Sequence, residues 1–418
     1  MKNTDHLFFS ILITVISFTS VSAQILSKKN IAYIKENAKN IAVDTNYVAG
    51  HWEPVLEQVK DKRIVLLGEL NHGVKENFIV RNDLIKFLYK KAGFDVILFE
   101  AGIGEVFVVD SCKSKLHAKT MTYSLIWQWQ NQEILDLFSF VKSNNISVAG
   151  FDIQRGFGGF FDKIFIEESR KKNIDTLLYK NIENQFIGLK KELANRKTVY
   201  ENVLDKTMEM IVAYQKIHAL LQPENNKGFI TKELAFTLKT IENRIDFLRY
   251  MLQFAKDKNY NKRWEARDLG MANNVKWLIE NIYKNRKIII IAHNFHISNH
   301  NEQEEVMGEF LKRELGDEMY SIGAFIGAGT YWQSGKENKF KPINESKLDI
   351  KHIIKTLSGR VHFIDVPTKI SHDGKWLQEK ILVNDSFLNL SGSNELIISK
   401  WFDGIILIDK STIPTKYQ

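Results

Sequence analysis

Two short polar segments of this 418-residue chain carry side chains suited to acid–base chemistry. The first, Gly-Glu-Leu-Asn-His-Gly, contains Glu69 and His72, and the second, His-Asn-Phe-His, has His293 and His296 at its ends. Histidine exchanges a proton near neutral pH, and a neighbouring carboxylate can orient its ring. These residue types at this spacing favour an enzyme over a structural protein.

Each of these segments directly follows a run of apolar residues, at 64–67 and 288–292. A continuous apolar run bounded by polar residues is typical of a strand buried on both faces of a parallel sheet. Glu100 and Asp152 follow two further apolar runs in the same way. Because α/β sheets bind ligands at the carboxyl ends of their strands, we expect all these side chains to meet at one edge.

We expect His72 to act as a general base, with Glu69 or Glu100 orienting its ring. His293 and His296 are expected to donate to a developing oxyanion or to hold a leaving group. No nucleophile for acyl transfer is evident, because the chain lacks a Gly-x-Ser-x-Gly turn.

Two further residues have a functional and a structural interpretation. Arg81, about two turns into the helix expected after the first strand, is a candidate partner for a carboxylate at the rim, or else a surface arginine. Asp152 either caps a helix or joins the polar network.

The same rim permits two other functions. His72, His293 and His296 suit a zinc or manganese ion chemically, which would make the protein a metal-dependent hydrolase. A ligand-binding protein that has kept the rim but lost turnover is the third possibility. The number of titratable groups in one cleft favours catalysis over binding alone.

The order of the apolar segments predicts an α/β fold with a mostly parallel central sheet flanked by helices. The expected strands are 63–67, 96–99, 147–151, 287–292, 320–326, 361–366 and 404–409. A helix is expected at 75–92, with Gly93 at its C-cap.

The region from about 174 to 283 shows no strand pattern. Two apolar helical faces, joined by a polar connection, predict a helical hairpin inserted between the third and fourth strands. Such an insertion would overhang the carboxyl edge and either form a wall of the substrate site or serve only as packing scaffold. We therefore expect residues 24–418 to form a single domain with this insertion.

The first 23 residues have the pattern of a secretory signal peptide, with a basic start, a short apolar core and Val21-Ser22-Ala23 before the cleavage point. An uncleaved anchor is the alternative. We expect an exported protein, periplasmic or secreted, without a membrane partner after cleavage. The net charge of +8 is spread along the chain, which does not favour nucleic-acid binding, and Cys112 alone forms no internal disulfide.

The chain resembles the erythromycin esterase family over nearly all of its mature length. The motifs that carry the resemblance are Leu66-Leu67-Gly68-Glu69-Leu70-Asn71-His72-Gly73, Glu76 with Arg81, Gly93-Phe94 with Phe99-Glu100, Trp127-Gln128 with Glu133, Gly150-Phe151-Asp152, Arg267-Asp268 with Met271-Ala272, Ala292-His293-Asn294-Phe295-His296, Gly323 and Phe402-Asp403-Gly404.

The resemblance implies that water attacks an ester or lactone, possibly of a macrolide antibiotic, without a required metal or cofactor. His72 would be the base, and the family's charged active-site cluster would comprise Glu69, Arg81, Glu100, His293 and His296. In this chain Asn71 stands where threonine is usual, and Phe295 where a small residue is usual. Both flank catalytic positions, so we expect them, with Asp152, to shape the substrate pocket. The sequence does not indicate the oligomeric state.

Overall fold

The computed structural model describes residues 26–44, 46, 51–156, 159–223, 230–383 and 394–417. The expected signal peptide at residues 1–23 lies outside this range, so cleavage and export stay predictions. Within the described ranges, no helix has both the length and the apolar character needed to cross a bilayer.

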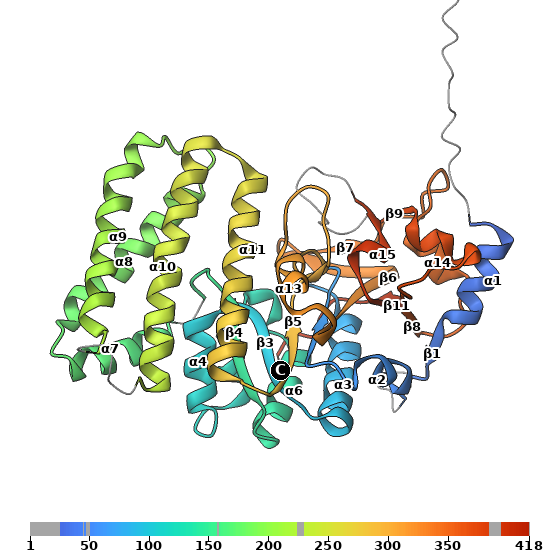
Figure 1. Ribbon diagram of the computed structural model, residues 1–418, viewed down its shortest axis with the longest axis horizontal. Helices are drawn as coiled ribbons and strands as arrows, with labels where there is room; N and C mark the ends of the chain where they lie inside the picture. Colours follow the sequence, from blue (N-terminus) through green and yellow to red (C-terminus); the bar gives the residue numbers. More distant parts are fainter. Residues whose placement is uncertain are drawn as a thin grey trace, which may run out of the picture.

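A nine-stranded sheet forms the centre of the molecule (Figure 1). Its order is β1 (Lys39–Ile41), β8 (Val361–Asp365), β11 (Gly404–Ser411), β6 (Met319–Gln333), β2 (Ile64–Leu67), β5 (Lys287–Ile291), β3 (Phe94–Gly102) and β4 (Ser147–Asp152), with β7 (Lys336–Lys339) paired to β6. The strands from β11 to β4 in this order are parallel, whereas β8, β1 and β7 pair antiparallel with their neighbours. Each expected strand is present, and the mostly parallel α/β fold is confirmed.

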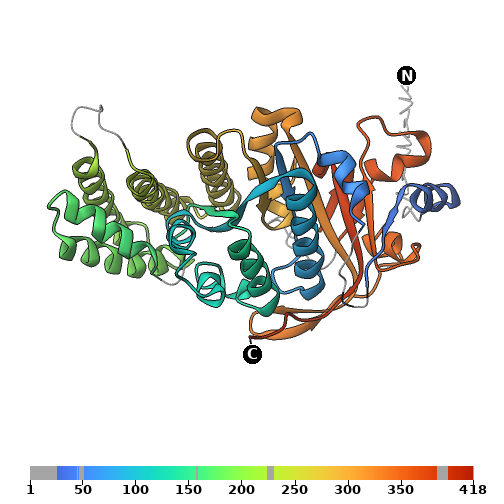
Figure 2. The same cartoon turned by 90° about the horizontal axis from the view of Figure 1, so that it is seen from below.

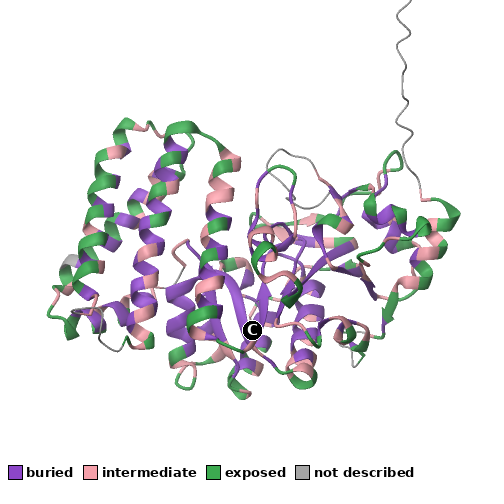
Figure 3. Ribbon diagram, in the orientation of Figure 1, coloured by how far each residue is buried: buried purple, intermediate pink, exposed green. Residues whose placement is uncertain are grey.

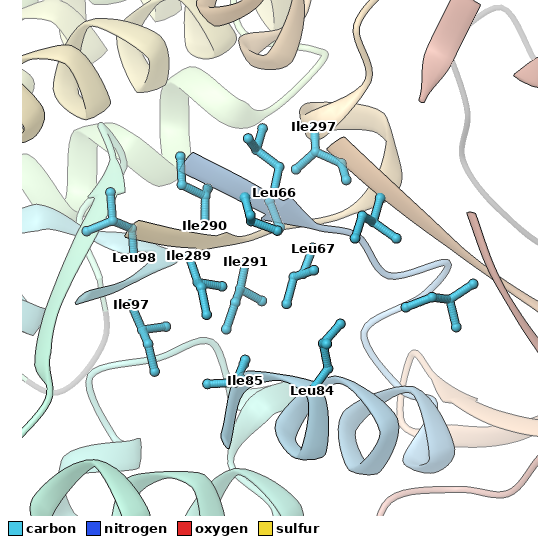
Figure 4. Close-up of a cluster of buried hydrophobic side chains, with 14 of the residues drawn as sticks. Leu66, Leu67, Leu84, Ile85, Ile97, Leu98, Ile289, Ile290, Ile291 and Ile297 are labelled. Carbon is cyan, nitrogen blue, oxygen red and sulfur yellow. The ribbon is translucent and has the colours of Figure 1, made fainter. Parts of the chain in front are cut away.

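The central strands are continuously apolar because both faces of the sheet are covered. In Figure 4, Ile289 and Ile291 of β5 point toward Leu84 of α3 (Lys75–Ala92), whereas Ile290 points to the opposite face. All three isoleucines are fully buried. The expected helix coincides with α3, and Gly93 ends it in the left-handed conformation, with φ of 74°.

The other helices cover the sheet and its connections. They are α1 (Lys28–Asn37), α2 (Glu53–Val59), α4 (Ile103–Cys112), α5 (Ala118–Thr122), η1 (Trp127–Trp129), α6 (Gln132–Ser143), α12 (Asn294–Ile297), α13 (Met307–Leu315), η4 (Gly316–Glu318), α14 (Ile350–Lys355), η5 (His372–Gln378) and α15 (Ile398–Trp401). A separate two-stranded sheet pairs β9 (Lys380–Leu382) with β10 (Glu395–Ile397).

The helical insertion lies to one side of the sheet and is larger than the expected hairpin (Figures 1 and 2). It comprises α7 (Phe161–Lys171), α8 (Thr176–Ala194), α9 (Glu201–Leu221), α10 (Lys232–Asp257) and α11 (Tyr260–Trp277), and η3 (Leu278–Ile282) leads from it to β5. The two apolar faces seen in the sequence belong to α8 and α10, while α9 and α11 pack beside them.

A second apolar core holds α7 to α10 together, with Phe165, Phe186, Tyr214 and Leu248 among its members, whereas the buried apolar residues of α11 belong to the core around the sheet. The outer faces of the insertion helices are exposed, in contrast to the buried strands of the sheet (Figure 3). The sheet and the insertion therefore each have an apolar core. That the two form the single expected domain stays a prediction.

Candidate active site

Four neighbouring strands deliver the expected polar residues to one edge of the sheet. Glu69 and His72 follow β2, and His293 follows β5. Glu100 lies in β3 near its end, and Asp152 is the last residue of β4. The prediction that these strand ends meet is confirmed by the strand order β2-β5-β3-β4.

A cavity of about 600 Å³ opens at this edge. It is lined by Asn71, His72, Glu100, Trp127, Gln128, Trp264, Arg267, His293, Phe295, His296, Trp332, Gln333 and Ser334. The remaining expected site residues, Glu69, Arg81 and Asp152, lie outside this lining. Glu69 bonds to His72 and Asp152 to Arg267, both in the lining, and Arg81 bonds to Glu69.

The ring of His72 is held by the buried carboxylate of Glu69. Nδ1 of His72 forms a hydrogen bond with Oε1 of Glu69. The same carboxylate accepts from Nη1 of Arg81 at 2.8 Å and from Nε1 of Trp129 at 2.9 Å. Among the described residues none bonds to Nε2 of His72, which leaves that nitrogen for the cavity.

These contacts determine the charges of both groups. Burial raises the pKa of Glu69, but Arg81 and His72 outweigh it and hold the pKa below its ordinary value. Glu69 is therefore an acceptor only, and Nδ1 of His72 carries the hydrogen. Burial lowers the pKa of His72, yet the hydrogen bond and charge of Glu69, with the charge of Glu100, raise it above the ordinary value.

His293 uses both ring nitrogens within the protein. Nε2 donates to the carbonyl of Leu70 at 2.8 Å, and Nδ1 accepts from the backbone N–H of Phe295 at 3.2 Å. Only a neutral ring makes both bonds, and burial lowers the pKa of His293 to about 4, assisted by the charges of His72 and His296. Because Leu70 belongs to the turn that carries His72, His293 supports that turn.

A second charged cluster forms the opposite part of the cavity floor. Arg267 of α11 donates from Nη2 to Glu100 at 2.9 Å and to Asp152 at 2.6 Å. Nδ1 of His296 lies 2.8 Å from Oδ1 of Asp268, and its Nε2 lies 3.3 Å from Oε1 of Glu100. The insertion thus contributes two charged residues, Arg267 and Asp268, to a site otherwise built at the sheet edge.

Surrounding carboxylates keep His296 and Arg267 charged. Burial lowers the pKa of His296, but Asp268 and Glu100 raise it to about 9. The pKa of Arg267 lies well above its ordinary value for the same reason, despite burial. Nη1 of Arg267 lies only 3.1 Å from Nε2 of His296, and the carboxylates offset the repulsion between these two cations.

Of the three residues expected to shape the pocket, Asn71 and Phe295 line the cavity, whereas Asp152 does not. Oδ1 of Asn71 accepts from the N–H of Gly73 at 2.9 Å, which stabilises the turn beneath His72. The ring of Phe295 lies edge-on to His296, with 5.0 Å between ring centroids.

The geometry does not match the donor set of the metal alternative. Both nitrogens of His293 are bonded to backbone groups, and both nitrogens of His296 contact charged side chains. In the part of the chain that the structure describes, no group of three or more His, Cys, Asp or Glu side chains is arranged to hold a metal ion.

Several residues that the structure places at this site were not predicted as site residues from the sequence. These are Trp127, Gln128, Trp129, Trp264, Arg267, Asp268, Trp332, Gln333 and Ser334. Adjacent opposite charges such as Arg267 and Asp268 are common on exposed helix surfaces. A signal for their role was that Arg267-Asp268 and Trp127-Gln128 lie within the family motifs.

Comparison with protein families gives a match to the family model described as erythromycin esterase, over residues 89–411. The matched range contains Glu100, Asp152, His293 and His296 and begins after the turn that carries His72. Two curated relatives are each 24% identical: a putative hydrolase, YbfO, from Bacillus subtilis strain 168, and erythromycin esterase type II from Escherichia coli. The alignments cover 85% of both chains for the first, and 88% of this chain and 94% of the relative for the second.

Solved structures share the fold. A Bacillus cereus protein has a TM-score of 0.75 at 20% identity, covering 93% of this chain and 99% of its own. A protein described as a succinoglycan biosynthesis protein has a TM-score of 0.71 at 18% identity, covering 94% and 100%. A histidine-to-asparagine variant of erythromycin esterase EreC in its open conformation has a TM-score of 0.62 at 16% identity, covering 90% and 98%.

Proposed function

The chain belongs to the erythromycin esterase family, and we propose that it is a hydrolase that cleaves an ester or lactone by attack of a histidine-activated water. The observation that carries the proposal is the state of His72. One ring nitrogen donates to the ionised Glu69, while the other has no bond to a described residue and is left for the cavity. That is the arrangement a general base requires.

The reaction proceeds in two steps. Nε2 of His72 accepts a proton from a water in the cavity as the water oxygen attacks the ester carbonyl carbon. The carbonyl π electrons move onto its oxygen, and the tetrahedral oxyanion then collapses and breaks the bond to the alcohol oxygen. The proton on His72 passes to that leaving oxygen, so one water is consumed and a carboxylic acid and an alcohol result.

The other charged residues support this step in different ways. Arg267 and His296 line the cavity and carry the positive charge that favours the oxyanion. Glu100 holds both cations in place. His293 acts as a positioning residue, because its bonds to backbone hold the turn that carries His72.

The direct test is mass spectrometry of a panel of simple esters, lactones and erythromycin incubated with the purified protein. We expect a mass gain of one water on at least one ester or lactone, lost in His72→Ala. The control is His372→Ala, because the side chain of His372 is 78% exposed. Turnover that survives His72→Ala contradicts the mechanism.

Two further measurements address the alternatives. Loss of turnover after chelation, restored by zinc or manganese, would favour the metal-dependent hydrolase. Tight binding of a panel member without product would favour a ligand-binding protein. The name of one relative, erythromycin esterase type II, suggests a macrolide lactone as substrate, and erythromycin in the panel tests that suggestion.

We also propose that the protein is exported to the periplasm or beyond. The support is the signal-peptide pattern of residues 1–23. N-terminal sequencing of protein recovered from cell fractions tests it, with a mature start at about Gln24 as the expected result. An intact N-terminus in the cytoplasmic fraction contradicts it.

A further inference from the structure

Three tryptophans from three separate elements surround the cavity above its charged floor. Trp127 lies in η1, Trp264 in α11 and Trp332 near the end of β6. Trp127 is 45% exposed, although tryptophan is among the most extensively buried residue types on average. Trp264 and Trp332 are half-buried, so all three rings leave apolar surface open beside the cavity.

Neutral polar groups alternate with these rings. The lining includes the amides of Gln128 and Gln333 and the hydroxyl of Ser334. These three side chains make no hydrogen bond to any residue within the described ranges. Amides and hydroxyls both donate and accept, so they match a ligand that carries groups of the same kind.

The charged side chains that line the cavity are paired with one another and do not contact the outer part of a ligand. At the floor, Glu100 forms ion pairs with both Arg267 and His296. The remaining lining residues away from His72 and His293 are aromatic or neutral and polar. The outer cavity therefore fits an uncharged group with apolar faces and polar edges.

The hairpin of β6 and β7 carries Trp332, Gln333 and Ser334, which form one wall of the cavity. Gln333 pairs with Lys336, and the two residues between them, Ser334 and Gly335, have φ of 52° and 80°, as in a tight two-residue hairpin turn. The N–H of Trp332 donates to the carbonyl of Gly73 at 2.8 Å. The wall is thus fixed relative to the turn that carries His72.

We propose that the substrate is an acylated carbohydrate, an inference that rests on the proposed ester hydrolysis. A sugar ring presents polarised C–H bonds on its faces and hydroxyls at its edges, and tryptophan faces carry partial negative charge that attracts such C–H bonds. The ring lies against Trp332 or Trp127, its hydroxyls bond to Gln128, Gln333 and Ser334, and the acyl group reaches His72. Water adds to the acyl carbon, its bond to the sugar oxygen breaks, and the sugar hydroxyl and a carboxylic acid are released.

The experiment compares two esters with the same acyl group. One is a mono-acetylated methyl glucoside and the other is cyclohexyl acetate, which has a six-membered ring without hydroxyls. We expect kcat/KM for the glucoside ester to be at least tenfold higher. Equal or greater activity on cyclohexyl acetate, or turnover confined to lactones, overturns the carbohydrate proposal and leaves ester hydrolysis standing. No turnover of any ester or lactone overturns both.

Variants of the wall supply a readout that a structural role would not produce. Trp332→Leu and Gln333→Ala are expected to raise KM for the glucoside ester about tenfold and to change cyclohexyl acetate much less, with Trp332→Phe in between. Asn338→Ala is the matched control, because Asn338 lies on β7 of the same hairpin and does not line the cavity. Equal losses on both esters overturn the proposal.

Discussion

At the residue scale, Glu69 determines what His72 can do. Glu69 is completely buried, and its two carboxylate oxygens accept from His72, Arg81 and Trp129. A buried carboxylate with these donors stays ionised, fixes the tautomer of His72 and makes its ring more basic. His293, only 5.7 Å from His72 between ring centroids, is neutral because backbone groups occupy both nitrogens. Two neighbouring histidines thus differ in basicity because of their partners.

The pH dependence of the reaction follows from this arrangement. His72 must be neutral to accept a proton, and its pKa is raised, so kcat/KM should rise with pH through an inflection higher than 6.5 to a plateau. The plateau should end near pH 9, where His296 loses the charge that favours the oxyanion. Glu69→Gln removes the charge that raises this pKa, so the inflection should move to lower pH while the plateau falls about 10²- to 10⁴-fold. An inflection that stays in place in Glu69→Gln would show that another group titrates.

His296 makes a second pH-dependent contribution, this time to stability. Its pKa is raised from 6.5 to about 9 in the folded protein, so its proton favours folding by about 3 kcal/mol at most. That contribution is complete below pH 6.5 and is lost as pH rises through about 9. Urea unfolding at pH 6, 8 and 9.5 should therefore show the gap in unfolding free energy between the native protein and His296→Gln shrinking as pH rises. A gap independent of pH would contradict this.

At the element scale, the sequence predicted the strands and the helix whose buried faces leave a regular pattern of apolar residues. The apolar runs of β2 and β5 mark strands covered on both faces, and α3 follows its helical spacing to Gly93. The residues of the site that lie on these strand ends were predicted with them.

The rest of the site depends on contacts between distant parts of the chain. Trp129 reaches Glu69 across 60 residues, and Arg267 reaches Glu100 across 167. Neither contact leaves a periodic pattern in the sequence. The sequence around a single polar residue on a helix looks the same whether that residue faces solvent or a buried carboxylate. The extra helices α9 and α11 were missed for a related reason, because no strand pattern separated them from their neighbours.

The turn beneath His72 and the β6–β7 hairpin approach too closely for any side chain between them. A Cβ added at Gly73 would lie 1.9 Å from the carbonyl oxygen of Trp332. Gly73→Ala should therefore displace the hairpin or the turn, destabilise the protein by about 1–3 kcal/mol and lower kcat. Thermal unfolding and kinetics measure both effects.

Gly188→Ala is the control for this prediction. It lies in α8, where an added Cβ meets nothing within 4 Å, so alanine should leave activity unchanged and stabilise the helix slightly. Unchanged kcat in Gly73→Ala would show that the contact with Trp332 does not position His72.

At the scale of the whole molecule, buried charge links the insertion to the sheet. Arg244 of α10 is 2% exposed and donates to Glu183 of α8 at 3.2 Å and to Glu105 of α4 at 3.3 Å. Phe236 of α10 stacks on Phe107 of α4, with 4.0 Å between ring centroids. α10 therefore packs into both apolar cores, and Arg267 of α11 completes the charged cavity floor. These contacts predict that the insertion and the sheet unfold together.

Substitution of Arg244 tests this coupling. Arg244→Met keeps much of the side-chain volume but leaves the buried carboxylate of Glu105 without a guanidinium partner, which should cost about 3–5 kcal/mol. Glu183 keeps its ion pair with Arg155 at 2.9 Å. Arg249→Met on the same helix removes an ion pair to Asp246 in which both side chains are more than half exposed, so it should change stability by less than about 1 kcal/mol.

Urea unfolding followed by circular dichroism, with hydrogen exchange of peptides from α9 and β5, measures the effect. We expect one transition in all three proteins, shifted to lower urea only in Arg244→Met, because α10 cannot leave one core without opening the other. Loss of protection in α9 at a urea concentration where β5 remains protected would show that the insertion is an independent domain.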